Sequence, residues 1–168
     1  MPAAPPAASP SAWVIHKFGG TSVADADCFR RVAAILDDQP AGRLGVVLSA
    51  CKGVTDALLG LVAQAEQRIP ENGSSIDAIR ARHAGIAAIT LDAETAREYL
   101  EAFDRDCRDI EGILHTVRLT RSAARNVIDL VAGYGEIWST RLFREFFARR
   151  QGRPGEVRWV DAREAVVV

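Results

Sequence analysis

The chain has 168 residues, of which 48% are apolar and 26% are charged, and its formal net charge at pH 7 is −1. This is the balance of a folded globular protein, and the length suits one α/β domain or part of a larger one. A nearly neutral chain has no bulk attraction to nucleic acid or to an anionic membrane, so neither is expected as a partner.

The first segment, Met1–Ala12, consists mostly of Pro, Ala and Ser and is expected to be a disordered tail. It contains no basic residue and no continuous apolar run, which excludes a secretory signal. The next segment, Trp13–Phe18, is short and β-branched and predicts a first strand. Gly19 and Gly20 end this strand.

A helix is predicted after the two glycines, because apolar residues recur at helical spacing as far as about Asp38. Thr21 or Ser22 is its expected N-cap. The apolar run Leu44–Ala50 then predicts a second strand, of the kind buried on both faces in a parallel sheet.

The middle of the chain is predicted to be helical. Thr55 is the expected cap of the first of these helices. The helix over Glu94–Val117 has apolar residues at alternating steps of three and four, which indicates a buried seam. The remaining predicted helices are Ile76–Ile89 and Arg121–Arg150, the latter broken or kinked around Gly133 and Gly135, and Glu156–Ala162 is predicted as a further strand.

This order of elements predicts an α/β fold, with a three-layer arrangement of a parallel sheet, helices on both of its faces and a helical insertion. Residues 13–168 are expected to be one domain, or the N-terminal part of one. The chain stops inside an apolar, β-branched run, so we expect that it is truncated at its C-terminus.

Two loops follow the predicted strands, Lys17–Ser22 and Ser49–Thr55, and both precede helices. Ligands of open α/β sheets bind beyond the carboxyl ends of the strands, and helix N-termini attract anions. The lysine precedes the glycines, so the loop is neither a Walker motif nor a dinucleotide fingerprint. From these residues alone, an anion site and an ordinary glycine turn remain open.

Three motifs occur in a fixed order: "KFGGTSV", "VVLSACKGVTDALL" and "GYGEIWSTRLF". In this order they resemble those of the aspartate kinases, members of the amino-acid kinase family. The strings "HKFGGTSVADA", "GEIWSTRL" and "VDAREAV" look most like the kinase end of bifunctional aspartokinase/homoserine dehydrogenases. The resemblance covers residues 14–168 and reaches roughly the middle of the family's kinase domain.

The resemblance implies a role for each matching residue. Lys17 is implied as the catalytic cation, which neutralises charge in the transition state. The ATP phosphates are implied to bind at Lys17, Gly19, Gly20, Thr21 and Ser22. The aspartate substrate is implied to bind at Ser49, Ala50, Thr55 and Glu136, with the glutamate on its amino group.

The implied reaction transfers the γ-phosphoryl group of ATP to the β-carboxylate of L-aspartate, at the start of lysine, threonine and methionine biosynthesis. Mg²⁺ enters with the nucleotide, and no metal-binding residues are assigned. NADP is implied only if a dehydrogenase domain follows. The resemblance implies a homo-oligomer as the full-length protein. The three cysteines form no CxxC pair, which favours a reducing cytoplasm and excludes a disulfide framework or zinc site.

Two other functions remain open: another kinase of the family, acting on glutamate, acetylglutamate or carbamate, or a non-catalytic interaction module. The family's base and ribose site, and the later residues near the reacting phosphate, have no counterpart in this sequence. We therefore expect the 168-residue chain to show no turnover by itself in a coupled ATP–aspartate assay.

Overall fold

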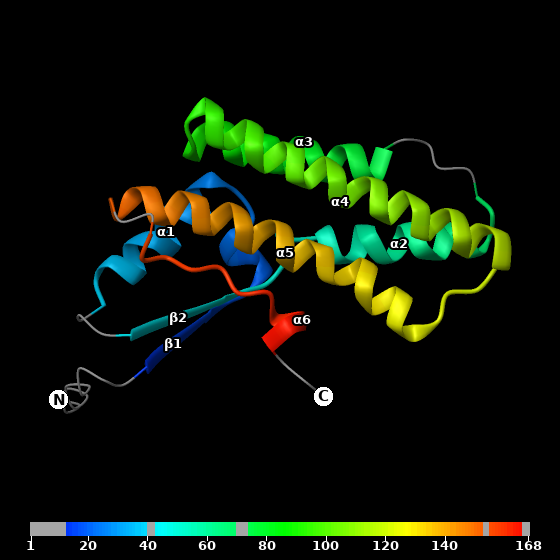
Figure 1. Cartoon of the computed structure of the whole chain (residues 1–168), viewed down its shortest axis with the longest axis horizontal. Helices are drawn as coiled ribbons and strands as arrows, with labels where there is room; N and C mark the ends of the chain where they lie inside the picture. Colours follow the sequence, from blue (N-terminus) through cyan, green and yellow to red (C-terminus); the bar gives the residue numbers. More distant parts are fainter. Residues whose placement is uncertain (1–12, 40–42, 70–73, 153–154, 166–168) are drawn as a thin grey trace.

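The computed structural model describes residues 13–39, 43–69, 74–152 and 155–165 (Figure 1). The expected tail, Met1–Ala12, and the apolar end of the chain lie outside these residues. The elements, in chain order, are β1 (Trp13–Phe18), the 3₁₀ helix η1 (Gly20–Val23), α1 (Ala26–Asp37), β2 (Arg43–Leu48), α2 (Val54–Glu66), α3 (Ser74–Thr90), α4 (Ala93–Thr120), α5 (Arg125–Arg150) and α6 (Ala162–Ala165).

β1 and β2 form a parallel pair, in register from Trp13 opposite Arg43 to Phe18 opposite Leu48. Parallel neighbours need a crossover connection, and α1 supplies it here. The predicted α/β class with a parallel sheet is therefore confirmed. The register also brings the carboxyl ends of both strands to the same edge, where the two predicted loops begin.

The two faces of this sheet differ in exposure. The inner face packs on the hydrophobic core through residues such as Phe18 and Val46, and α1 and α5 lie on this side (Figure 1). On the outer face, Trp13, Ile15 and Val47 are 61%, 62% and 51% exposed. The prediction that the second strand is buried on both faces is therefore wrong for the described residues. The sequence predicted helices on both faces of the sheet, but among the described residues no helix covers the outer face.

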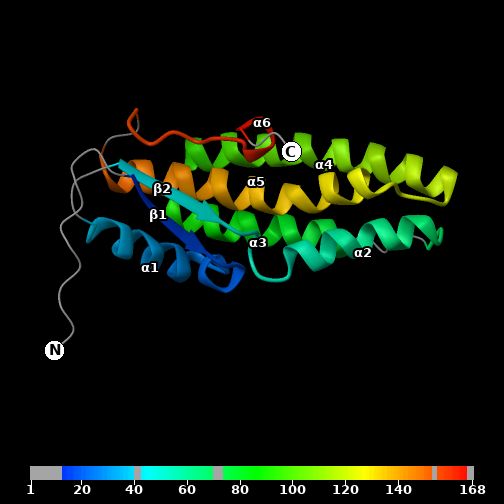
Figure 2. The same ribbon diagram turned by 90° about the horizontal axis from the view of Figure 1, so that it is seen from below.

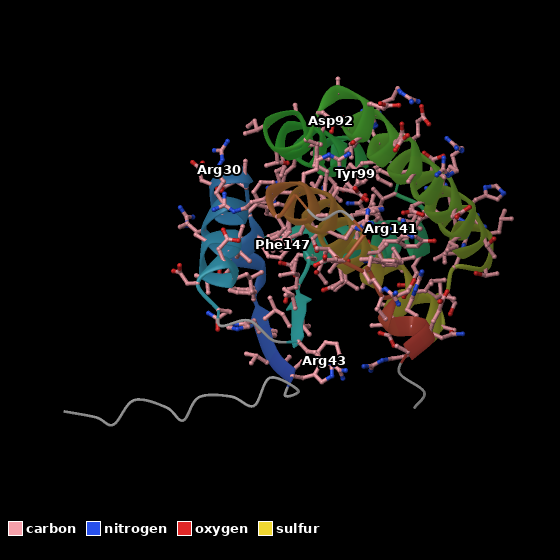
Figure 3. The ribbon with its side chains drawn as sticks, turned by 60° about the vertical axis from the view of Figure 1, so that its left-hand side comes forward. Arg30, Arg43, Asp92, Tyr99, Arg141 and Phe147 are labelled. Atoms are coloured by element: carbon pink, nitrogen blue, oxygen red, sulfur yellow. The ribbon has the colours of Figure 1, made fainter. Side chains whose placement is uncertain are left out.

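Helices α2, α3, α4 and α5 pack lengthwise against one another (Figure 2). Tyr99 on α4 is buried in this bundle, and Phe147 is buried where α5 lies beside α1 (Figure 3). In the part of the chain that the structure describes, no helix combines the length and apolarity needed to cross a bilayer. The predicted seam of α4 is core, with its buried members at Phe103, Cys107, Ile110, Leu114 and Val117.

Two helices start differently from the prediction. Asp25, and not Thr21 or Ser22, caps α1, because its carboxylate accepts a hydrogen bond of 2.8 Å from the backbone N–H three residues on. Thr21 and Ser22 lie within η1 instead. α2 begins after Gly53, whose φ of 79° is left-handed and favours glycine. Thr55 is therefore the second residue of α2 and not its cap.

The predicted strand at Glu156–Ala162 is also wrong, because within the described residues 157–161 join no sheet and α6 follows them. The polar groups of residues 157–161 bond to α5 instead. The Arg144 guanidinium donates to the carbonyl of Val157 at 3.2 Å, and the indole N–H of Trp159 donates to the hydroxyl of Thr140 at 2.9 Å. A strand forms only where the backbone of a neighbouring strand completes its hydrogen bonds. This segment lies against α5, which offers it side chains and no free backbone edge.

α5 runs without interruption, so of the predicted break or kink around Gly133 and Gly135, the break is wrong. Gly135 is buried, and a Cβ atom there would lie 2.8 Å from the Cβ of Ala50 and 3.2 Å from a methyl of Val54. A Cβ at Gly133 would meet nothing within 4 Å. Gly135 therefore serves close packing of α5 on the loop after β2.

We expect Gly135→Ala to lower the free energy of unfolding by about 1–3 kcal/mol, because the added methyl group overpacks this contact. Gly133→Ala is the matched control on the same helix, and we expect it to raise that free energy by up to about 1 kcal/mol through helix propensity. Urea denaturation measures both. Equal effects of the two substitutions would show that α5 does not approach the loop so closely.

His83 on α3 is fully buried against the rings of Phe103 and Trp138, and burial lowers its pKa to about 4. The unfolded chain takes up a proton near pH 6.5, whereas the folded chain resists it until about pH 4. The contribution of neutral His83 to the free energy of unfolding is therefore fully present above pH 6.5. It is lost as the pH drops toward 4, which lowers the free energy of unfolding by roughly 3 kcal/mol in all.

We expect His83→Leu to remove most of this fall in stability between pH 6.5 and 4.5, whatever it does to stability at pH 7. His115→Leu is the control, because His115 is exposed on α4. Carboxylates act in a lower window: the hydrogen bond from the Thr95 backbone N–H lowers the pKa of Asp92 to about 2. Urea denaturation at a series of pH values decides, and an unchanged slope in His83→Leu would contradict the assignment.

Candidate functional site

The loops that follow β1 and β2 are bonded directly to each other. The backbone N–H of Ser49 donates to the carbonyl of Phe18 at 3.0 Å, which extends the ladder by one bond. The N–H of Lys52 then donates to the carbonyl of Gly20 at 3.1 Å. A Cβ atom at Gly20 would lie only 2.7 Å from the carbonyl oxygen of Ala50, so the loops approach closely because this residue is glycine.

The glycine loop leaves the sheet at the end of β1. Lys17 is the second-last residue of the strand, and its side chain is exposed. Gly19 has extended backbone, and its carbonyl accepts a hydrogen bond of 2.9 Å from the N–H of Ser22, which closes η1. Thr21 is exposed and Ser22 is half-buried. Of the five predicted phosphate-binding residues, Lys17 therefore lies at the end of β1 and the other four lie in the turn that follows, beside the loop after β2.

Glu136 joins this site from a distant part of the chain. Its carboxylate accepts a hydrogen bond of 3.3 Å from the backbone N–H of Ala50, although the two residues are 86 positions apart. Gly135, next to it, packs on the Cβ of Ala50. Thr55 follows in the first turn of α2. The structure thus brings Ser49, Ala50 and Glu136 together, and these residues lie beside the glycine loop.

Ser139 belongs to the same cluster and was missed by the sequence analysis. It is fully buried, and its hydroxyl contacts two carbonyl oxygens, that of Ser49 at 2.8 Å and that of Glu136 at 3.1 Å. The hydroxyl of Thr140 lies 2.6 Å from the same Glu136 carbonyl. A serine three residues after Glu136 lies on the same face of a helix, and this spacing is the signal that identifies it.

This arrangement is suited to bind an anion and an ammonium group side by side. Lys17 and the turn of η1 offer positive charge and backbone N–H groups, and Glu136 offers a half-buried carboxylate. Cys51 lies in the loop after β2, between Ala50, which bonds to Glu136, and Lys52, which bonds to Gly20. It is not a nucleophile, because burial raises the pKa of its thiol to about 12. Among the described residues, no three of His, Cys, Asp and Glu gather as metal ligands.

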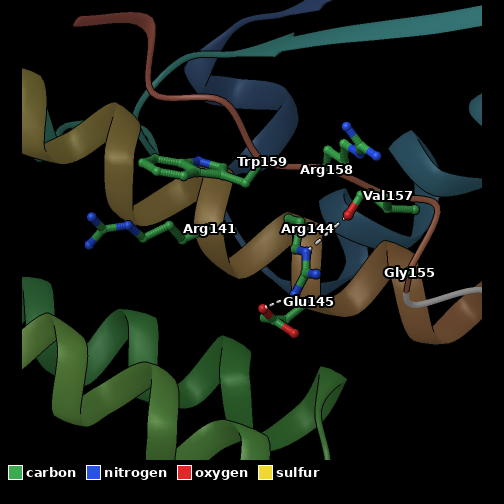
Figure 4. Close-up of a pocket in the computed structure, with 7 residues that line it drawn as sticks. All are labelled: Arg141, Arg144, Glu145, Gly155, Val157, Arg158 and Trp159. Atoms are coloured by element: carbon green, nitrogen blue, oxygen red, sulfur yellow. Dashed lines mark hydrogen bonds and ion pairs between the residues drawn. The ribbon is translucent and has the colours of Figure 1, made fainter. Parts of the chain in front are cut away.

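A separate pocket opens on the other side of α5 (Figure 4). Two of its three arginines, Arg141 and Arg144, already bond within the protein. Arg144 pairs with Glu145 and bonds to the chain at Val157, and Arg141 pairs with Asp106 at 2.8 Å while it lies over the ring of Trp159. These contacts give the pocket a structural role. Its lining residues are Arg141, Arg144, Glu145, Gly155, Val157, Arg158 and Trp159.

Comparison with known proteins gives consistent matches over nearly the whole chain. A model of the amino acid kinase family matches residues 12–166. The chloroplastic bifunctional aspartokinase/homoserine dehydrogenase of Daucus carota is 33% identical over 156 residues, which are 93% of this chain and 17% of that protein. The lysine-sensitive aspartokinase 3 of Escherichia coli (strain K12) is 34% identical over 153 residues, 91% of this chain and 32% of that protein.

A solved structure gives the same relationship. The crystal structure of E. coli aspartokinase III in complex with aspartate and ADP (R-state) superposes with a TM-score of 0.68 at 33% identity. The superposition covers 82% of this chain and 29% of that one. The chain therefore spans less than a third of the length of each of these relatives.

Proposed function

Because this chain belongs to the amino acid kinase family, we propose that its protein is an aspartate kinase, and that residues 13–168 form the phosphate loop and part of the aspartate site. The reaction transfers the γ-phosphoryl group of ATP to the β-carboxylate of L-aspartate, the first step toward lysine, threonine and methionine. Mg²⁺ binds together with the nucleotide, as MgATP.

In this proposal the glycine loop binds the phosphates. Gly19, Gly20 and Thr21 offer backbone N–H groups, Thr21 and Ser22 offer hydroxyls, and Gly20 leaves no side chain between the loops. Lys17 neutralises charge on the transferring phosphoryl oxygens. The β-carboxylate of aspartate is already ionised at neutral pH, so no general base is needed. Positioning and charge neutralisation then account for most of the rate.

On the aspartate side, Ser49, Ala50 and Thr55 contact the substrate, and the carboxylate of Glu136 binds its ammonium group. One observation supports this proposal most strongly: Glu136 reaches across 86 residues to the N–H of Ala50. The same loop is bonded to the glycine loop through Lys52 and Gly20. The proposed ammonium site would thus lie beside the proposed phosphate site, as transfer between ATP and an amino acid requires.

A substrate panel tests the proposal on the protein made from its complete reading frame. We expect MgATP-dependent phosphorylation of L-aspartate, and little turnover with glutamate, acetylglutamate or carbamate. Turnover of one of these in place of aspartate would assign the protein to another kinase of the family. Absence of turnover with all four would favour a non-catalytic interaction module.

The setting of the enzyme is part of the same proposal. We propose a cytoplasmic homo-oligomer, fused to homoserine dehydrogenase as in the relative from Daucus carota, with NADP as the cofactor of that second part. The similar identity to the aspartokinase of E. coli leaves a monofunctional enzyme as the alternative. An NADP-dependent homoserine assay on the complete protein separates the two.

A further inference from the structure

The basic residues of this chain are distributed unevenly. Of its 21 lysines and arginines, only Lys17 and Lys52 are lysine, and the other 19 are arginine (21 − 2). Lys17 lies at the carboxyl end of β1, and Lys52 lies in the loop that follows β2. Both lysines therefore occur at the one edge of the sheet where the candidate site lies.

Lys52 is a direct neighbour of the glycine loop. Its N–H donates to the carbonyl of Gly20 at 3.1 Å. Its N and Cα atoms lie 3.5 Å from the place where a Cβ of Gly20 would stand. Arg82 on α3 donates a hydrogen bond to the carbonyl of Lys52, so both backbone polar groups of this residue are held. The backbone position of Lys52 beside the turn is thus fixed, while its side chain is exposed.

The lysines also differ from the arginines in their partners. Many arginines pair with acids, for example Arg80 with Asp104 at 2.5 Å and Arg149 with Asp92 at 2.7 Å. Within the described residues, neither lysine makes an ion pair or a side-chain hydrogen bond. A lysine ammonium is a compact point charge with three donors and binds phosphate, as the arginine fork also does, so the two lysines are distinguished by having no acidic partner.

We propose that Lys52 is a second cation of the phosphate site, which binds the polyphosphate chain of the nucleoside triphosphate together with Lys17. Arg82 acts as a positioning residue, because it holds the Lys52 carbonyl. This inference rests on the proposed function. It adds a residue from the loop after β2 to a phosphate site that otherwise belongs to the loop after β1. Two positive charges match a polyphosphate better than one.

Amine footprinting tests the inference without an activity assay. The 168-residue chain is acetylated with and without inorganic tripolyphosphate, and the two lysine-containing peptides are quantified by mass spectrometry. We expect acetylation of Lys17 and Lys52 to slow by at least about threefold, as charge pairing with an anion demands. Protection of Lys17 alone would overturn the role of Lys52 and leave the proposed function intact. Protection of neither would overturn both.

Kinetics of the complete enzyme give the second readout. We expect Lys52→Ala to raise the KM for MgATP about tenfold and to change the KM for aspartate less than about twofold, the effect of one lost charge-assisted bond. Lys52→Arg should recover part of the loss. Arg97→Ala, which removes an exposed charge on α4 far along the chain, is the control and should leave both constants unchanged. Equal KM values for MgATP in Lys52→Ala and wild type would overturn the inference.

Discussion

We expect replacement of Lys17 with alanine to lower kcat for the proposed phosphorylation of aspartate by about 10²-fold or more, because the transferring phosphoryl group would lose its neutralising cation. Lys17 is exposed and lies at the end of β1, so the fold does not depend on its charge. The melting temperature of the variant should therefore match that of the parent. Steady-state kinetics of the complete enzyme, with MgATP and aspartate both saturating, measure the fall.

The control removes a different exposed cation. Arg30 on α1 pairs only at the surface with Asp27, at 2.7 Å, and Arg30→Ala should leave kcat within about twofold of the parent, as is usual for such pairs. Lys17→Arg keeps the charge but changes its shape, and an intermediate rate would indicate that charge is the larger part of the effect. A Lys17→Ala enzyme as active as its parent would remove the phosphate-site assignment altogether.

The elements that the sequence predicted well are those whose signal is local. β1 is a short run with β-branched residues that two glycines end, and its predicted bounds are those observed. The seam of α4 repeats at three and four residues, and its members from Phe103 to Val117 are buried. Hydrophobic periodicity records burial directly, so these elements follow from the chain alone.

The failures concern features that depend on a distant partner. A glycine in a helix reads as a break, but Gly135 is required by contact with Ala50, 85 residues earlier (135 − 50). The segment near Trp159 has strand propensity, but it packs on α5, where the indole N–H of Trp159 donates to the hydroxyl of Thr140. Local propensity cannot report which neighbour a segment will meet in the folded chain.

The candidate site divides in the same way. The glycine loop was visible as a turn between a strand and a helix, and the loop after β2 as a strand end. Glu136 had no physical signal of its own, and the resemblance to a family supplied it. Ser139 had only its spacing of three residues from Glu136 on the same helix, and the carbonyls that it contacts, those of Ser49 and Glu136, are visible only in the folded structure.

Glu136→Gln should raise the KM for aspartate by about 10²-fold while the KM for MgATP changes less than about threefold, because one partner of a buried charge pair is lost. Glutamine keeps the size of the side chain and a carbonyl oxygen that can accept the N–H of Ala50. The loop should therefore stay in place, and the free energy of unfolding should be unchanged. Glu94→Gln, in the exposed first turn of α4, is the matched control and should leave both KM values unchanged.

A KM effect alone does not distinguish a ligand of the ammonium group from a residue that only supports the loop. Succinate, which has the two carboxylates of aspartate without its amino group, makes this distinction. If Glu136 binds the ammonium group, the preference of kcat/KM for aspartate over succinate falls by about 10²-fold in Glu136→Gln, because the discriminating charge pair is gone. If Glu136 only supports the loop, kcat/KM falls equally for aspartate and succinate, and the preference is retained. A retained preference would therefore leave Glu136 with the Ala50 hydrogen bond as its only role and would move the ammonium site elsewhere.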